Sequence, residues 1–408
     1  MLKVGIFTDT YFPQVNGVAT STATLKRNLE ALGHEVYVFT TTNPLAEQNE
    51  DKTYRVPSIS IVSDHRLAMF YRRRLATKIK SLNLDVIHTH TEFSLGIFGR
   101  LVAKKFKIPL VHTYHTIYED YTHYIIKSKR FDAVSKEIAR KISKKFCNTS
   151  DKLIVPTHKV KELLMSYGVI KEMSIIPTGI ALHRFTTQNS DPAQDQALRK
   201  GLGIKENEHI ILYIGRIAKE KNIQVLLAHL QPYVKEKTDV KFVLVGDGPE
   251  KSNLEGLVRQ YEMEDHVIFV GEVPWECVMD YYRIGDVFVS ASQSETQGLT
   301  YIEALASGLP VIAKEDPCLE GVVENAVNGY TFADKEAFLH ALDIVLYNEQ
   351  HQKQLSVNAT RSVEKFSETV FAKNVEALYV EVLMTKQTNQ EGVATHEDQA
   401  VFRKRGSH

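Results

Sequence analysis

The amino-acid sequence predicts an α/β protein built from two doubly wound parallel-sheet domains. Three observations predict this fold class. The chain has 408 residues, which is too long for one core of ordinary size and suits two or three domains. Short apolar runs typical of buried parallel strands alternate with longer helical patterns. The alternation stops at a polar stretch near the middle of the chain and then starts again.

The composition is typical of a globular protein, with 43% hydrophobic residues, 25% charged residues and a mean hydropathy of -0.22. It excludes a largely disordered chain, a collagen-like chain and a disulfide scaffold. The sequence contains no run of about 18 apolar residues, so we expect no membrane-spanning helix. The N-terminus shows no secretory signal. Cys147, Cys277 and Cys318 are scattered without a CxxC pair, so we expect inert buried thiols and a cytoplasmic location.

The first domain is expected over residues 1–180. Its predicted strands are 2–8, 36–40, 85–89, 109–113 and 152–155, and its predicted helices are 18–32, 95–106 and a segment running through Met165. Gly33 and Gly168 follow two of these helices, as glycines do at helix ends. A polar linker is expected over 181–205.

The second domain is expected over residues 206–365. Its predicted strands are 209–214, 241–245, 267–270, 286–290 and 310–313, with helices between them. A helix at about 366–385 is expected to pack back on the first domain. Residues 386–408 are expected to form a polar tail that ends in expression-tag residues.

The two halves of the chain differ in charge. Residues 1–180 carry 27 Lys and Arg against 16 Asp and Glu, and the remainder carries 23 against 34. The net charge of zero therefore hides a basic half and an acidic half. A basic half suggests contact with an anionic surface.

Two polar segments of the first half follow predicted strands. The loop 8–18 contains Asn16-Gly17 at a predicted helix start. Glycine lets the backbone approach a ligand closely, and the N–H groups of a helix start favour negative charge. An ordinary turn between strand and helix explains the same residues equally well. His112 and His115 follow the strand 109–113. A lone histidine is more often structural. The sequence shows no third ligand at a suitable spacing, so we expect no metal site here.

Two segments of the second half predict an anion site. After the strand 209–214, Arg216 offers a planar fork and Lys221 a point charge where a helix begins; a solvated basic turn is the alternative. After the strand 286–290, a helix starts near Gly298, and its first amides can meet phosphate oxygens. Glu295 and Glu303 flank that start, and carboxylates accept several hydrogen bonds from sugar hydroxyls.

These segments resemble one known family. The pair Glu295 and Glu303, the segment from Gly215 to Asn222, and the motifs PQVNGV and IPTGI are similar to the retaining glycosyltransferases of the glycogen-synthase-like group, family 4. That group has the GT-B fold, in which two Rossmann-like domains face each other across a cleft. The segment HTYHTIYEDYTHYI at 112–125 more narrowly resembles the bacterial 1,2-diacylglycerol 3-glucosyltransferases.

The resemblance implies roles for individual residues. Arg216 and Lys221 would hold the donor diphosphate and Glu303 the ribose. Glu295 and His115 would contact the transferred sugar. Gly17, Gly298, Leu299 and Thr300 would bring backbone close to the donor. Catalysis would then depend on positioning and charge stabilisation, with attack on the face that the leaving phosphate vacates.

The resemblance also implies the substrates. UDP-glucose would be the donor and 1,2-diacylglycerol the acceptor, giving alpha-monoglucosyldiacylglycerol for membrane glycolipid and lipoteichoic-acid anchors. It implies no tightly bound cofactor and leaves room for stimulation by Mg²⁺. The enzyme would lie peripherally on the inner face of the cell membrane. Transfer to another lipid or a saccharide is the alternative within the family.

Two basic amphipathic stretches, 65–80 and 131–146, bear on the membrane. Each repeats an apolar residue at every fourth position beside Lys and Arg, as in helices that lie on anionic lipid. A helix that packs its apolar stripe inward has the same pattern. A non-enzymatic membrane- or nucleic-acid-binding module is a further alternative, but no aromatic-basic stacking motif supports nucleic-acid binding.

Overall fold

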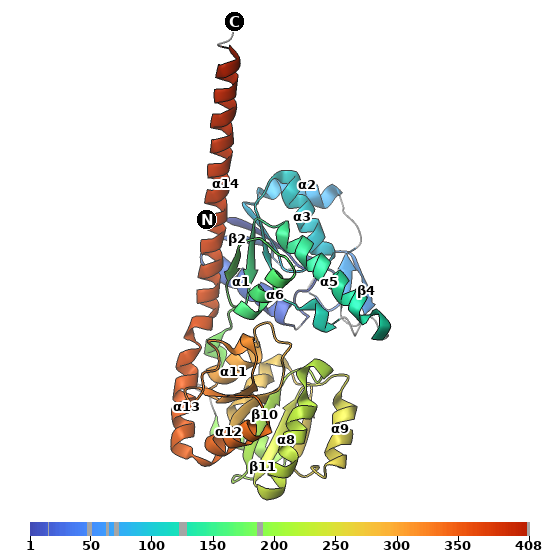
Figure 1. Cartoon of the computed structure of the whole chain (residues 1–408), viewed down its shortest axis with the longest axis vertical. Helices are drawn as coiled ribbons and strands as arrows, with labels where there is room; N and C mark the ends of the chain where they lie inside the picture. The colour runs from blue at the N-terminus through green and yellow to red at the C-terminus, as the bar shows by residue number, and fades with distance from the viewer. Residues whose placement is uncertain are drawn as a thin grey trace. The chain divides into compact units, whose positions relative to one another are not determined.

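The structure is a computed structural model that describes residues 1–14, 16–46, 51–62, 65–68, 73–121, 129–185 and 191–405. The chain forms two compact units. One consists of Met1–Gly179 together with the chain from Glu368 onward, and the other is Ile180–Ser367. Each unit contains a parallel sheet with helices packed against it (Figure 1). The predicted α/β class with two parallel sheets is confirmed.

The first unit has a seven-stranded parallel sheet with the order β3-β2-β1-β6-β7-β8-β9. Its strands are β1 (Lys3–Phe7), β2 (Glu35–Thr41), β3 (Thr53–Val56), β6 (Val86–Thr89), β7 (Leu110–Thr113), β8 (Lys152–Val155) and β9 (Met173–Ile175). A separate antiparallel pair joins β4 (Ser58–Val62) to β5 (His65–Ala68). Neither this pair nor the edge strands β3 and β9 were expected from the sequence.

The second unit has a six-stranded parallel sheet with the order β12-β11-β10-β13-β14-β15. Its strands are β10 (His209–Ile214), β11 (Val240–Val245), β12 (Val267–Gly271), β13 (Val287–Ser290), β14 (Val311–Lys314) and β15 (Gly329–Phe332). In both sheets the strand order reverses beside the first strand, between β1 and β6 and between β10 and β13. Doubly wound sheets bind ligands outside the carboxyl ends of the strands at such a reversal.

Helices connect the strands of both sheets. They are α1 (Gly17–Ala31), α2 (Arg73–Leu82), α3 (Ser94–Phe106), α5 (Lys129–Asn148), α6 (His158–Ser166), α7 (Pro192–Gly201), α8 (Ile223–Glu236), α9 (Lys251–Gln260), α10 (Val278–Ile284), α11 (Leu299–Ala306), α12 (Lys335–Tyr347), α13 (Glu349–Ser362) and α14 (Glu368–Arg405). Several begin at a side-chain cap. Asn16, Thr157 and Asp334 each accept a hydrogen bond from a backbone N–H of the first turn.

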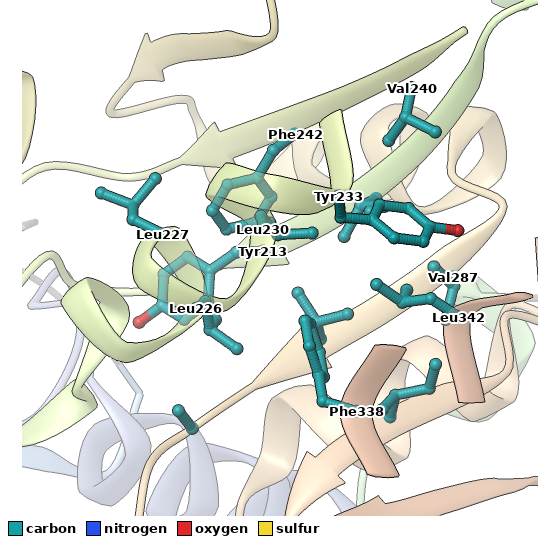
Figure 2. Close-up of a cluster of buried hydrophobic side chains, with 14 of the residues drawn as sticks. Tyr213, Leu226, Leu227, Leu230, Tyr233, Val240, Phe242, Val287, Phe338 and Leu342 are labelled. Carbon is teal, nitrogen blue, oxygen red and sulfur yellow. The ribbon is translucent and has the colours of Figure 1, made fainter. Parts of the chain in front are cut away.

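Apolar side chains from helices and strands interlock in the core of the second unit. Figure 2 shows Leu226, Leu227 and Leu230 of α8 beside Phe242 of β11 and Phe338 of α12. All five are fully or almost fully buried. Burying a side chain of this size stabilises the folded state by about 1.5–3 kcal/mol relative to leaving it exposed.

The long helix α14 completes the core of the first unit. Phe371, Val375, Tyr379 and Val382 recur on one face of the helix and are buried in the same cluster as residues of β1 and α1. The helix runs beside α1 (Figure 1). It continues to Arg405, whereas the sequence analysis expected a polar tail from residue 386.

The stretch expected to be a linker, 181–205, contains the helix α7 and belongs to the second unit. Asp191 caps α7 and Pro192 occupies its first turn. Arg283 of α10 donates to Asp195 of α7 with 3.0 Å between Nε and Oδ1. A polar surface helix held by capping and an ion pair carries a weak apolar signal, which explains why the prediction was wrong.

Candidate active site

The loops that follow β10 and β11 approach each other closely at the sheet reversal of the second unit. A Cβ atom added to Gly246, whose φ is +133°, would lie 2.0 Å from the carbonyl oxygen of Gly215. Only glycine permits this approach. Ile217 N donates to Asp247 O at 2.9 Å and ties the same two loops together.

Arg216 lies exposed in the loop after β10. Its carbonyl oxygen accepts a hydrogen bond from the Tyr213 hydroxyl at 3.1 Å, which holds the backbone of the turn. A guanidinium on a braced turn is suited to bidentate recognition of phosphate.

Lys221 and Glu295 form an ion pair across the sheet reversal. Lys221 Nζ donates to Glu295 Oε1 at 2.5 Å, and the two side chains are 18% and 19% exposed. Asn222, which adopts a left-handed φ of 54°, donates to the carbonyl oxygen of Ala291 at 3.4 Å. These contacts bring the loop after β10 to the loop after β13, so two sequence-predicted residues 74 positions apart become neighbours.

The helix α11 begins beside this ion pair. Gly298 precedes its first residue with a φ of +72°, and no side chain caps the helix. A Cβ at Gly298 would lie 2.3 Å from the ring of Tyr301. Gly298 offers no side-chain cap to the first turn of the helix, and backbone N–H groups of a first turn, such as those of Leu299 and Thr300, suit an anion or a sugar oxygen.

Glu303 lies on α11, partly buried. Tyr282 of α10 donates its hydroxyl to Glu303 Oε2 at 3.0 Å. Burial raises the pKa of Glu303 to about 7, and the hydrogen bond from Tyr282 opposes this rise only in part. A carboxyl group held in this way can accept hydrogen bonds from vicinal hydroxyls. Tyr282 is a contributor that the sequence analysis missed, because only tertiary packing places α10 against α11.

His115 and Gly17 belong to the first unit. Gly17 is exposed and is the first residue of α1. His115 is partly buried just after β7, and its Nε2 lies 2.9 Å from Nδ1 of His90, which follows β6. Burial lowers the pKa of His115 to about 3.

A network of buried polar side chains surrounds this histidine pair, and the sequence analysis missed it. Asp9, after β1, accepts hydrogen bonds from Thr91 Oγ1 and from the Leu95 N–H at the start of α3. Glu92 accepts from the Tyr118 hydroxyl and lies 3.0 Å from Nε2 of His112. The available signal was the polar run 88–92, which begins at the end of the buried strand β6.

Clustered histidines are also common metal ligands. Within the described ranges, no three His, Cys, Asp or Glu side chains are arranged to hold a metal ion. Cys147 and Cys318 are buried as expected, whereas Cys277 is exposed, so the expectation of buried thiols is wrong for this residue. Cys277 ends a short 3-10 helix at the start of α10, outside the core.

The two amphipathic stretches behave differently. On α2, Ile79 is fully buried, so its stripe packs inward; residues 69–72 of this stretch lie outside the described residues. On α5, Val134, Ile138 and Ile142 are 55%, 52% and 44% exposed. The apolar stripe of α5 therefore faces outward.

A second exposed apolar row runs from the residue that precedes the neighbouring helix α3 onto the helix itself. Phe93, Ile97 and Leu101 are all exposed. The two helices touch, because the Arg100 guanidinium stacks over the Phe146 ring at 4.4 Å. No helix in the described part of the chain is long and apolar enough to cross a bilayer.

Comparisons with known proteins agree with this geometry. Residues 15–184 match the family model "Glycosyltransferase Family 4", and residues 194–362 match "Glycosyl transferases group 1". The chain is 38% identical to the alpha-monoglucosyldiacylglycerol synthase of Acholeplasma laidlawii, over 94% of this chain and 98% of that protein. It is 39% identical to the synthase of the same name from Streptococcus pneumoniae, over 94% of this chain and 87% of that protein.

Solved structures share the fold at low identity. HepE of Anabaena in complex with UDP superposes with a TM-score of 0.73 at 16% identity, covering 93% of this chain and all of that one. Sucrose-phosphate synthase from Thermosynechococcus elongatus gives 0.73 at 23% identity, covering 94% and 100%. Together with the family models, these likenesses confirm the GT-B fold that the sequence motifs implied.

Proposed function

The chain belongs to the glycosyltransferase family that includes the alpha-monoglucosyldiacylglycerol synthases, and on this basis we propose that it transfers glucose from UDP-glucose to the 3-hydroxyl of 1,2-diacylglycerol. The product would be alpha-monoglucosyldiacylglycerol, formed with retention at the anomeric carbon. The relatives at 38% and 39% identity support the acceptor and the hexose. UDP in the HepE complex supports a nucleotide-sugar donor.

The observation that carries the proposal is the pairing of Lys221 with Glu295 beside the uncapped start of α11. A cation, a carboxylate and the N-terminal amides of a helix at one sheet reversal are the groups that a sugar diphosphate needs. Glu295 is held by Lys221, and a carboxylate accepts several hydrogen bonds at once, so we place it at the hydroxyls of the hexose. Arg216 and Lys221 supply positive charge for the diphosphate.

The proposed reaction breaks the bond between the anomeric carbon and the β-phosphate oxygen of UDP-glucose. The electron pair of this bond remains on that oxygen. The acceptor hydroxyl oxygen forms the new bond to the anomeric carbon on the same face, and its proton passes to the departing phosphate. Arg216 and Lys221 stabilise the charge that gathers on UDP, which lowers the barrier electrostatically.

Two protein cations at the diphosphate also bear on cofactors. We propose that the enzyme has no tightly bound cofactor and that Arg216 and Lys221 perform the neutralisation that a divalent cation performs elsewhere. Activity in EDTA is therefore expected to persist. Added Mg²⁺ is expected at most to stimulate it.

The test uses the full-length protein, UDP-[¹⁴C]glucose and liposomes that contain 1,2-diacylglycerol. Label is expected in a chloroform-soluble product, and Arg216→Ala is expected to lower kcat/KM by about 100-fold or more. The control is Arg259→Ala, which removes an exposed arginine from α9 in the same unit. Full activity of Arg216→Ala would contradict the site assignment.

The acceptor is tested in the same assay. A relative at 26% identity from Bacillus anthracis is named an N-acetyl-alpha-D-glucosaminyl L-malate synthase, so L-malate and soluble sugars serve as competing acceptors. Transfer to these compounds without lipid would replace diacylglycerol in the proposal and would leave the donor site intact.

We also propose that the first unit binds the inner face of the cell membrane peripherally through α3 and α5. Their exposed apolar rows, defined above, lie beside Lys136, Lys141, Lys144 and Lys145 of α5. Each cation near an anionic lipid surface contributes about 1 kcal/mol. The apolar side chains add further free energy as they enter the interface.

Vesicle sedimentation tests this surface. The variant Ile138→Glu with Ile142→Glu is expected to lower binding to phosphatidylglycerol-containing vesicles by about 10-fold or more, since two exposed apolar side chains are lost and negative charge is added. Val357→Glu adds one negative charge at an exposed apolar position of α13 in the second unit and serves as control for the single variant Ile138→Glu. Unchanged binding by the double variant would exclude α5 as the contact.

A further inference from the structure

Two histidine rings meet at the carboxyl ends of β6 and β7. His90 Nδ1 and His115 Nε2 lie 2.9 Å apart, and the rings are nearly parallel, with an interplanar angle of 21°. Among the residues that the structure describes, His90 is the hydrogen-bond partner of the His115 ring. Two ring nitrogens at this distance share one proton, so one histidine donates and the other accepts.

Both rings are neutral. Burial lowers the pKa of His90 well below its ordinary value, and the neighbouring His88 and His115 lower it further. Burial likewise lowers the pKa of His115 to about 3. Each neutral imidazole carries one N–H, so the direction of the shared hydrogen bond fixes which nitrogen of each ring is protonated.

The far nitrogen of His90 decides this direction. His90 Nε2 is buried and has no hydrogen-bond partner within the described ranges. If His115 donated, His90 would carry its proton on Nε2, and an N–H donor would be buried without an acceptor, at about 1–3 kcal/mol. If His90 donates from Nδ1, its Nε2 bears only a lone pair, and orphaned acceptors are tolerated better than orphaned donors.

The ring of His90 is itself held in place. His88 packs against it with 4.1 Å between ring centroids. Nδ1 of His88 lies 2.7 Å from the Tyr379 hydroxyl of α14, and its Nε2 lies 2.7 Å from Thr113 Oγ1. The packing keeps His90 from rotating away from His115.

We propose that His90 is a positioning residue that fixes His115 as the Nδ1–H tautomer, so that His115 presents a neutral N–H donor to an oxygen of the transferred hexose. The inference rests on the proposed function, together with the contact between His115 and the transferred sugar that the family resemblance implies. It adds what that contact is chemically: a donor that keeps its proton, rather than a base that removes one. His90 itself touches no substrate in this scheme.

The tautomer can be measured directly in the unmodified full-length protein. With ¹⁵N-labelled histidine, long-range ¹H–¹⁵N correlation spectra separate protonated from bare ring nitrogens. The signals of His115 are identified by their loss in His115→Gln. We expect a protonated Nδ1 and a bare Nε2 for His115; a protonated Nε2 would overturn the proposal.

Activity of a matched pair of variants tests the consequence. In His90→Asn, the side-chain amide replaces the Nδ1–H donor, and kcat is expected to stay within about 3-fold of the unmodified protein. In His90→Asp, a carboxylate of the same shape only accepts, which forces a proton onto His115 Nε2. A wrong histidine tautomer reduces kcat by orders of magnitude in serine proteases, so a loss of about 100-fold is expected.

The outcomes separate the two proposals. Equal losses in folded His90→Asn and His90→Asp would overturn the positioning role of His90, even if glucosyl transfer by the unmodified protein is normal. Absence of glucosyl transfer by the unmodified protein, with the expected tautomer in the spectra, would instead overturn the proposed function. If His90→Asp does not fold, the spectra of the unmodified protein decide the direction of the hydrogen bond.

Discussion

The two units have the same strand reversal but opposite chemistry at it. In the second unit β10 and β11 end in glycine turns, and charged side chains follow β10 and β13: Arg216 is exposed, and Lys221 is paired with Glu295. In the first unit the strands end in buried imidazoles such as His88 and His90, which are neutral and hydrogen-bonded. The fold therefore supplies the place for a site, and the first residues after each strand decide what it binds.

The net charge of each half of the sequence does not predict the charge of the groups at its sheet reversal. The basic half of the sequence contains the neutral histidine cluster, and the acidic half contains the candidate diphosphate site. The cations of the first unit are instead spread over its helices, as on α5. The net charge of a domain reflects the charged side chains on its outer surface. The charge at a binding site depends on which groups are buried there.

The largest expected effect tests the glycine turns. Gly246→Ala should lower the free energy of unfolding of the second unit by about 3 kcal/mol. The new Cβ would clash with the Gly215 carbonyl oxygen, and residue 246 has a positive φ that residues other than glycine rarely adopt. Trp275 is the chain's single tryptophan and lies in this unit, so urea unfolding followed by tryptophan fluorescence reports it.

Gly256→Ala is the matched control for that measurement. Gly256 lies within α9, and an added Cβ meets nothing within 4 Å. Because alanine favours helix over glycine, this variant is expected to gain up to about 1 kcal/mol. Similar losses in both variants would remove the argument for a close backbone approach.

The next effect depends on pH. Glu303 has a pKa of about 7 in the folded unit against an ordinary value of 4.5, so the unfolded chain ionises first as pH rises. The wild-type unit therefore loses stability between these values, by about 2–3 kcal/mol from pH 5 to pH 8, relative to Glu303→Gln, which does not titrate. Tryptophan fluorescence in urea at both pH values measures the difference. A pH-independent difference between the two proteins would mean that Glu303 is ionised in the fold at pH 5.

The smallest effect tests the histidine cluster. Tyr379→Phe removes the hydroxyl that meets buried His88, and we expect a loss of about 1 kcal/mol in the first unit, since a buried hydrogen-bonding group loses its partner. Hydrogen exchange of the β6 amides measures this loss. Tyr330→Phe is the control: it removes a similar hydrogen bond to His351, but these two side chains are partly exposed, so water can replace the lost hydroxyl. Hydrogen exchange of the β15 amides should therefore barely change.

The sequence predicted most strands and the residues at the second sheet reversal, because apolar runs and glycine turns are local signals. The edge strands β3, β9 and β15 were missed, since their sequences TYRV, MSI and GYTF lack the continuous apolar run of the predicted strands. The pairing of His90 with His115 was missed because it joins two strands that become neighbours only in the folded sheet. Periodicity located both amphipathic helices, but the stripes of α2 and α5 look alike until their packing partners are known.

The helix α14 has a consequence for synthesis of the chain. Its buried residues, from Phe371 to Val382, belong to a core whose strands begin at Val4. A ribosome therefore releases the second unit, Ile180–Ser367, before the first can acquire its last packing layer. Until then the nascent first unit exposes the apolar side chains that pack against α14, so truncation near Ser367 should leave a chain that depends on chaperones.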